Sequence, residues 1–142
     1  GKSIIVYEGG ESLRFDEMAI QNGIDGTLRL MKSFGMRDEA PEISYKPRTF
    51  LKSSWVRAKV SGLFRTTLKP GDKITRGQHL GSLTDPYGET NINLKATHNG
   101  YVVGLNRMPV VSAGDALLHI GNRAESKPKT DANDLRREAK SV

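Results

Sequence analysis

Glu8 is the residue whose type and position most favour a chemical role. It follows the apolar run 4–7 and is followed at once by Gly9 and Gly10. A carboxylate held at a glycine-flanked strand end can take and return a proton while leaving room for a substrate. From the residues alone, the competing interpretation is an exposed acid at a turn, because lone carboxylates are common on protein surfaces.

Glu11 and Arg14 lie close enough to Glu8 in sequence to share the rim of the same pocket. Arg14 is a candidate substrate-binding residue, because a guanidinium can hold the carboxylate of an acidic substrate through two parallel hydrogen bonds. The same position also suits an exposed residue at the start of a helix, so both interpretations stay open.

The histidines do not predict a metal site. His79, His98 and His119 are separated by 19 and 21 residues, without the close pair that zinc sites use. We expect two strand histidines and one turn histidine, with His79 and His119 at equivalent places of an internal repeat. The absence of cysteine excludes disulfides and thiolate chemistry. No serine-nucleophile elbow, phosphate-binding loop or dinucleotide fingerprint is present.

The elements that must position these residues fall into four parts. In residues 1–37 the pattern predicts a buried strand from Ile4 to Tyr7, followed by a turn. A helix is predicted to begin at Asp16 and to end at Gly35. Residues 38–53 read as a linker broken by prolines. Residues 54–121 show short apolar runs punctuated by glycine, typical of an all-β domain. Residues 122–142 are expected to be a mobile polar tail, since they contain few apolar side chains.

An internal repeat lies within the predicted β domain. "VRAKVSGLF" (56–64) is echoed by "LKATHNGYV" (94–102), displaced by 38 positions, and "RGQHLGSL" (76–83) by "AGDALLHI" (113–120), displaced by 37. A near-constant displacement predicts two copies of one β unit that interlock into a small sandwich or barrel.

The repeat resembles the barrel-sandwich hybrid domains that carry biotin or lipoate on a lysine. The connection between the two copies, "LTDPYGETNIN", contains no lysine. Lys95 falls inside the second copy, opposite Arg57 in the first, and is predicted to be a strand residue. A swinging-arm carrier role is therefore not expected.

The charge of +6 is unevenly spread. Residues 1–45 have five basic and eight acidic side chains, whereas residues 46–76 have nine basic side chains and only Asp72 as an acid. A basic segment of this kind attracts nucleic acid, an anionic lipid surface or an acidic small substrate, or is simply a solvated face. No apolar run approaches the length of a membrane span, and we expect a soluble cytoplasmic protein with no membrane partner.

A non-catalytic β module that binds an anionic partner such as nucleic acid is one functional hypothesis. Small β-barrels bind single strands with basic grooves and stacked aromatics. Phe50, Trp55 and Phe64 do interleave with basic residues. Yet aromatic residues make up only 6% of the chain, and Trp55 and Phe64 fit the core of the first repeat equally well. Nucleic acid is therefore not expected as the partner.

A second hypothesis comes from a family resemblance. The order "VYEGGESLRFDEMAIQNGIDGTLRLMKSFGM", "VRAKVSGLFRTTLKPGDKITRGQHLGSLTDPYGE" and "ATHNGYVVGLNRMPVVSAGDALLHIG" resembles the C-terminal part of the succinylglutamate desuccinylase/aspartoacylase family. The resemblance implies a zinc-carboxypeptidase-like α/β domain followed by a β domain of the barrel-sandwich type. It also implies that Glu8 is the general base. The family holds zinc with a His-x-x-Glu pair and a later His, all upstream of the glutamate, and no His-x-x-Glu occurs here.

The sequence thus predicts a mainly β fold, a barrel-sandwich hybrid (biotinyl/lipoyl-like) domain preceded by a strand-turn-helix remnant of an α/β zinc-hydrolase domain. The predicted function is that of a C-terminal fragment of a zinc-dependent deacylase acting on N-acyl amino acids or similar amides and esters. Its β domain would shape active-site access or a subunit contact in a homo-oligomer. The chain alone lacks the zinc ligands and is expected to be inactive.

Overall fold

The computed structural model describes residues 3–122, which fall into two units. The first unit comprises residues 3–46 and the second residues 47–122. The division after Lys46 lies inside the stretch predicted to be a linker. Except for Asn122, the predicted polar tail lies outside the described residues.

The first unit contains one helix, α1 (Glu17–Ser33). It begins where the Asp16 side chain accepts a hydrogen bond from the Ala19 N–H at 3.0 Å, which satisfies one of the unpaired donors of the first turn. It ends where Gly35 adopts a left-handed φ of 71° and donates to the Lys32 carbonyl at 3.0 Å. The helix and its stop agree with the sequence prediction.

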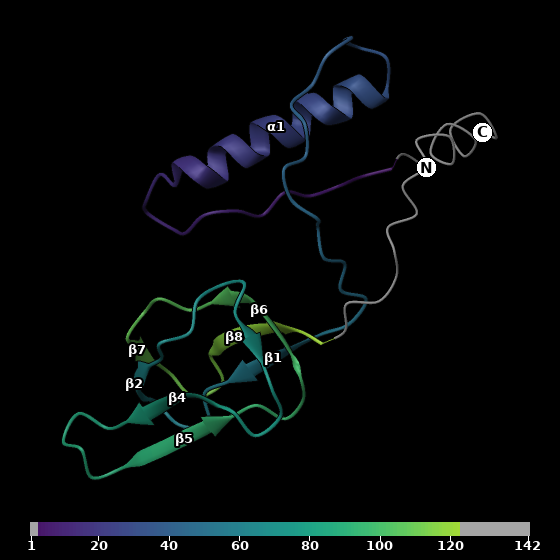
Figure 1. Cartoon of the computed structure of the whole chain (residues 1–142). Coiled ribbons are helices and arrows are strands. Elements are labelled where there is room, and N and C mark those ends of the chain that lie inside the picture. Colours follow the sequence, from purple (N-terminus) through teal and green to yellow (C-terminus); the bar gives the residue numbers. More distant parts are fainter. Residues whose placement is uncertain (1–2, 123–142) are drawn as a thin grey trace. The chain divides into compact units, whose positions relative to one another are not determined.

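The predicted strand from Ile4 to Tyr7 is wrong. The segment runs extended beside α1 (Figure 1) without forming a strand. Ile4, Ile5 and Val6 are 85%, 74% and 76% exposed. A strand needs a neighbour to pair its backbone N–H and C=O groups, and no strand in residues 3–46 supplies one.

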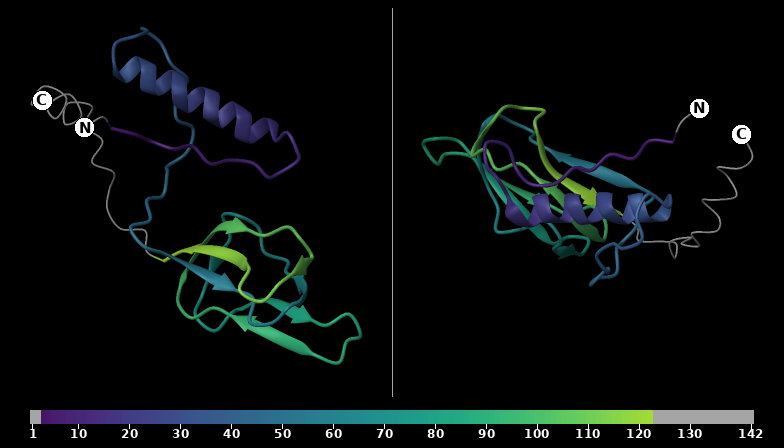
Figure 2. Two further views of the ribbon diagram at one scale, coloured as in Figure 1. Left: turned by 180° about the vertical axis from the view of Figure 1, so that it is seen from behind. Right: turned by 90° about the horizontal axis from the view of Figure 1, so that it is seen from above.

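The second unit consists of eight strands in two antiparallel four-stranded sheets (Figures 1 and 2). One sheet has the order β1-β8-β6-β3 and the other β5-β4-β2-β7, and they do not close into a barrel. The strand bounds are β1 (Ser53–Arg57), β2 (Gly62–Arg65), β3 (Lys73–Ile74), β4 (His79–Thr84), β5 (Asn91–Lys95), β6 (Gly100–Leu105), β7 (Val110–Val111) and β8 (Ala116–Gly121).

The sheet order confirms the predicted duplication. Strands β1 to β4 come from the first copy and β5 to β8 from the second, and exchanging each strand for its counterpart converts one sheet order into the other. The hydrogen bonds repeat as well. Ala58 N–H donates to the Asp115 carbonyl at 2.8 Å, and its counterpart Ala96 N–H donates to the Gln78 carbonyl at 2.9 Å. The two copies therefore have the same local structure.

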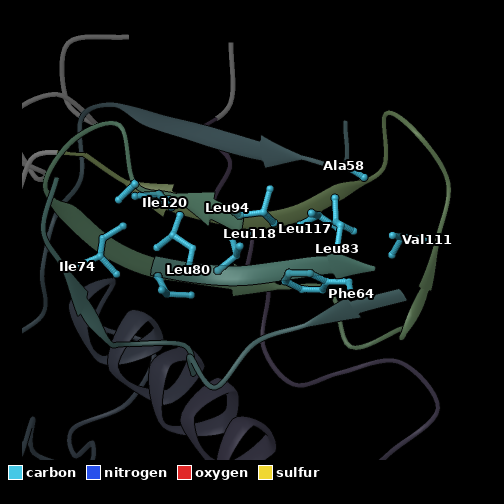
Figure 3. Close-up of a cluster of buried hydrophobic side chains, with 12 residues drawn as sticks. Ala58, Phe64, Ile74, Leu80, Leu83, Leu94, Val111, Leu117, Leu118 and Ile120 are labelled. Carbon is cyan, nitrogen blue, oxygen red and sulfur yellow. The ribbon is translucent and has the colours of Figure 1, made fainter. Parts of the chain in front are cut away.

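The two sheets contribute to a single apolar core (Figure 3). Each sheet supplies residues that are almost fully shielded from solvent, such as Leu83 from β4 and Leu118 from β8. The core side chains are Ala58, Phe64, Ile74, Leu80, Leu83, Leu94, Ala96, Val102, Val111, Leu117, Leu118 and Ile120. Burial of this kind is the main favourable term in folding, so the β domain has its own source of stability.

Candidate functional site

Tyr7 fixes the end of the extended segment against α1. Its hydroxyl donates a hydrogen bond to the Ala19 carbonyl at 2.6 Å. Its ring lies over Gly23, where an added Cβ would stand 2.9 Å from the Tyr7 Cε1 atom. Gly9 passes equally close to the other end of the ring, since a Cβ there would stand 2.4 Å from the hydroxyl oxygen. The two glycines thus make room for Tyr7 beside the helix.

Glu8 directly follows this anchored tyrosine. Its side chain is exposed, and its carboxylate forms no ion pair or hydrogen bond within residues 3–122. Glu8 is therefore held through its backbone neighbours while its carboxylate stays available. That arrangement suits a group that must accept a proton from outside this unit.

A shallow cavity of about 130 Å³ lies between the loop after Glu8 and the start of α1. Glu11 and Arg14 both line it, as their sequence spacing suggested, but Glu8 does not. The Arg14 Nε atom lies 3.5 Å from the Glu11 carboxylate, and the Arg14 side chain is 76% exposed. An exposed ion pair of this kind contributes little stability, so Arg14 can exchange Glu11 for another carboxylate at low cost.

The loop that carries this ion pair has an unusual backbone. Leu13 has φ of 64°, in the left-handed region that residues other than glycine rarely adopt, and its side chain is fully exposed. Gly10 is also left-handed, with φ of 83°. A left-handed leucine without buried contacts costs free energy. Nothing within residues 3–46 offsets that cost by burying the side chain.

The histidines are engaged in other contacts. His98 Nε2 is within hydrogen-bond distance of the Asn122 side-chain oxygen and lies 3.0 Å from the Ser54 hydroxyl oxygen, while its Nδ1 lies 2.8 Å from the Thr97 hydroxyl oxygen. The Ser54 hydroxyl donates to the same Asn122 oxygen at 3.1 Å, so its proton points at the amide and not at His98.

The other two histidines lie in different sheets. His79 begins β4 and is exposed, whereas His119 lies in β8 with its ring stacked on Trp55. The expectation that they occupy equivalent places of the repeat is wrong, because the counterpart of His79 is Ala116. No group of three potential metal-ligating side chains occurs within residues 3–122.

The hairpin between β4 and β5 connects the two copies of the repeat and contains no lysine. Here Asp85 organises the turn by accepting backbone hydrogen bonds from Tyr87 at 2.7 Å, from Glu89 at 3.3 Å and from Thr90. Desolvation raises the pKa of the Asp85 carboxyl, but these hydrogen bonds outweigh it and hold the pKa below its usual value. The turn is acidic and self-contained.

Sequence reasoning did not separate Trp55 from Phe64. Phe64 is 5% exposed and belongs to the core, whereas Trp55 is 53% exposed on the outer side of β1. The alternation within "SSWVR" carried the signal, because Val56 faces the core and its neighbour must face outward.

The comparisons with known proteins bear on the fold. No family model and no curated protein matches the chain. Solved structures do match: a succinylglutamate desuccinylase/aspartoacylase from Rhodobacter sphaeroides has a TM-score of 0.72 at 20% identity, over 80% of this chain and 37% of that one. The ectoine utilization protein EutE (DoeB) from Ruegeria pomeroyi, in a product-bound structure, has a TM-score of 0.68 at 16% identity, over 76% and 34%.

A succinylglutamate desuccinylase from a Silicibacter species gives a TM-score of 0.63 at 17% identity, over 77% of this chain and 34% of that one. The matched fraction of this chain is larger than the fraction that the β domain makes up. The likeness therefore extends into the first unit. This chain spans about a third of the length of these proteins. At such identities the likeness establishes a shared fold.

No helix within the described residues is long and apolar enough to cross a membrane.

Proposed function

We propose that this chain is the C-terminal part of a zinc-dependent deacylase of the succinylglutamate desuccinylase/aspartoacylase type, which hydrolyses N-acyl amino acids or similar amides and esters. The main observation in support of the proposal is the order of the structural elements along the chain. A glutamate at the end of an extended segment is followed by two glycines, a helix and a duplicated β domain. Proteins of that type share this fold over 80% of the chain.

Glu8 is the general base in this proposal. Its carboxylate takes a proton from the attacking water as the water oxygen bonds to the acyl carbon. The proton then passes to the leaving nitrogen or oxygen as the acyl bond breaks. The anchored Tyr7 supports this role, because it holds the backbone before Glu8 in place while the Glu8 side chain stays exposed.

The described residues do not fit the zinc that the resemblance implies. His98 uses both ring nitrogens, His119 is stacked on Trp55, and no group of three potential ligands includes His79 within residues 3–122. We therefore assign the zinc ligands to residues outside this chain, and we expect the chain alone to be inactive. No catalytic step in this proposal runs through a metal held here.

The remaining residues have supporting roles in the proposal. Arg14 binds the carboxylate of an acidic substrate by giving up its ion pair with Glu11. The β domain, which we propose to be a barrel-sandwich hybrid, shapes access to the site or a subunit contact in a homo-oligomer. Its basic segment from Lys46 to Arg76 attracts acidic substrates. We place the enzyme in the cytoplasm.

The test compares this chain with the longer protein that contains it. Each is dialysed against about micromolar zinc, its metal content is measured, and hydrolysis of a panel of N-acyl amino acids is assayed with and without chelator. The proposal predicts chelator-sensitive hydrolysis by the longer protein and neither hydrolysis nor stoichiometric zinc for this chain. One tightly held zinc per chain with hydrolysis by the chain alone would contradict the assignment of the ligands. A longer protein that hydrolyses none of the substrates would contradict the function.

A further inference from the structure

The outer side of the sheet β1-β8-β6-β3 carries two rows of aromatic rings. In the first row the Phe50 ring lies on the backbone of Gly121, where an added Cβ would stand 2.6 Å from the Phe50 Cγ atom. Tyr101 stands beside it, with 5.8 Å between the ring centroids. In the second row Trp55 stacks on His119, with 4.0 Å between centroids and 7° between planes. We refer to these four residues as the aromatic face.

The strand register places the two rows next to each other. Ser53 pairs with Gly121, and Trp55 pairs with His119 two residues along the same strands. Directly opposed residues point to the same side of a sheet. Two residues of an antiparallel strand span about 6.8 Å, so the two rows lie side by side on this sheet.

Trp55 offers an open ring surface. It is 53% exposed although one side of its ring is covered by His119. The Nε2 atom of His119 is buried and has no hydrogen-bond partner among the described residues. This nitrogen makes no stabilising hydrogen bond, so stacking is the main contact of the imidazole. The His119 ring therefore supports one face of the Trp55 ring.

The same face is positively charged. The Arg48 guanidinium lies 4.1 Å from the centroid of the Tyr101 ring, and Lys73 pairs with Tyr101 from β3, on the same side. Arg57 follows Trp55 by two residues and donates to the Gly114 carbonyl at 2.8 Å. The four strands of this sheet contain neither aspartate nor glutamate. A ligand for this face must therefore combine negative charge with flat rings.

We infer that the aromatic face binds single-stranded nucleic acid, with a base stacked on Trp55 and phosphates beside Arg48 and Lys73. The prediction that nucleic acid is not a partner depended partly on Trp55 belonging to the core, and its exposure removes that reason. Base stacking on an aromatic side chain contributes about 1–3 kcal/mol per base and tolerates any sequence. The inference is independent of the deacylase proposal.

Trp55 is the only tryptophan in the chain, so its fluorescence reports on this face alone. The experiment titrates the 142-residue chain with oligothymidylate of about twelve nucleotides. We expect saturable quenching of Trp55 fluorescence at about micromolar concentrations, with affinity falling steeply between about 50 and 200 mM salt. No quenching at the lower salt concentration, or equal quenching by polyglutamate or by anionic lipid vesicles, would overturn the inference.

Variants locate the site, with a labelled oligonucleotide and fluorescence anisotropy as the readout. Trp55→Leu should weaken binding by about 5- to 150-fold, whereas Trp55→Phe, which keeps a ring, should retain most of it. Tyr87→Leu is the matched control, because Tyr87 is 89% exposed but lies in the β4–β5 turn. Thermal melting checks that each variant folds. Equal affinity of Trp55→Leu and Tyr87→Leu would overturn the inference.

Charge is tested by a second matched pair. Arg48→Gln should weaken binding and lower the salt dependence, because it removes a cation from the aromatic face. Arg65→Gln removes an exposed arginine from β2 in the other sheet and should change affinity by no more than about twofold. If both substitutions weaken binding equally, the attraction comes from overall charge and not from this face.

Discussion

The two units differ in what each can bury by itself. No residue in the described part of the first unit is buried, and the apolar side chains of α1 and of the preceding segment remain largely exposed. The β domain, in contrast, shields twelve apolar residues in one core. The β domain therefore has an apolar core of its own, whereas residues 3–46 have none.

The strongest test of this difference between the units is to produce each unit as a separate fragment. A fragment of residues 47–130 should unfold in one cooperative thermal transition, because it retains the whole core. A fragment of residues 1–46 should give the circular dichroism spectrum of a largely disordered chain, since an isolated 17-residue helix is marginal in water. Cooperative unfolding of residues 1–46 alone would refute the distinction.

Truncating one large side chain in each unit should lower the free energy of unfolding by unequal amounts. Leu118→Ala removes a side chain that is 0% exposed and should lower the free energy of unfolding by about 2–5 kcal/mol. Ile24→Ala removes one that is 48% exposed on α1 and should change it by no more than about 0.5 kcal/mol. Urea denaturation of the full chain measures both, with Trp55 fluorescence following the β domain and the helical circular dichroism signal following α1. Comparable losses would mean that α1 packs more tightly than its exposure indicates.

Glycine substitutions should have opposite signs in the two units. An added Cβ at Gly62 would stand 2.5 Å from the Thr84 carbonyl oxygen of the neighbouring strand, so Gly62→Ala should destabilise the β domain by about 1–3 kcal/mol. Gly26 lies within α1 with open space around it, so Gly26→Ala should stabilise the helix by about 0.5–1 kcal/mol. Thermal melting by circular dichroism separates the two, and a stabilising Gly62→Ala would contradict the packing described for β2 and β4.

The repeat was the most predictable part of the molecule. Glycines and alanines at constant displacement predicted the duplicated β unit because turns and close strand approaches tolerate few other residues. The helix was predictable for a similar reason, since Asp16 and Gly35 are local start and stop signals.

The candidate site was less predictable, because its geometry depends on contacts that no local pattern encodes. Ile4 to Tyr7 reads as a buried strand, yet burial requires a neighbour that residues 3–46 do not contain. The anchoring of Tyr7 on α1 depends on Gly9 and Gly23, which are fourteen positions apart in the sequence. The stacking of Trp55 on His119 depends on the register of β1 against β8, which places the two residues opposite each other.

The smallest expected effect is the pH dependence of the stability that Asp85 gives to the β4–β5 turn. Since hydrogen bonds lower the pKa of the folded carboxyl, Asp85 stabilises the domain above the unfolded pKa of about 4, and this contribution is lost as pH falls through the lower folded value. The melting temperature of Asp85→Asn should lie below that of the unmodified chain near neutral pH, and the gap should close in acid. A gap independent of pH would show that the charge of Asp85 is not involved.

The most direct test of the central claim is the turnover of the longer protein carrying Glu8→Gln, beside Glu17→Gln as a control on another exposed carboxylate. If Glu8 is the general base, Glu8→Gln lowers turnover of N-acyl amino acids by about 100-fold or more, the usual scale for loss of such a group, and leaves zinc content unchanged. Glu17→Gln stays within about twofold, because it alters only a helix-end charge. Turnover of Glu8→Gln equal to that of Glu17→Gln would contradict the claim that Glu8 is the base.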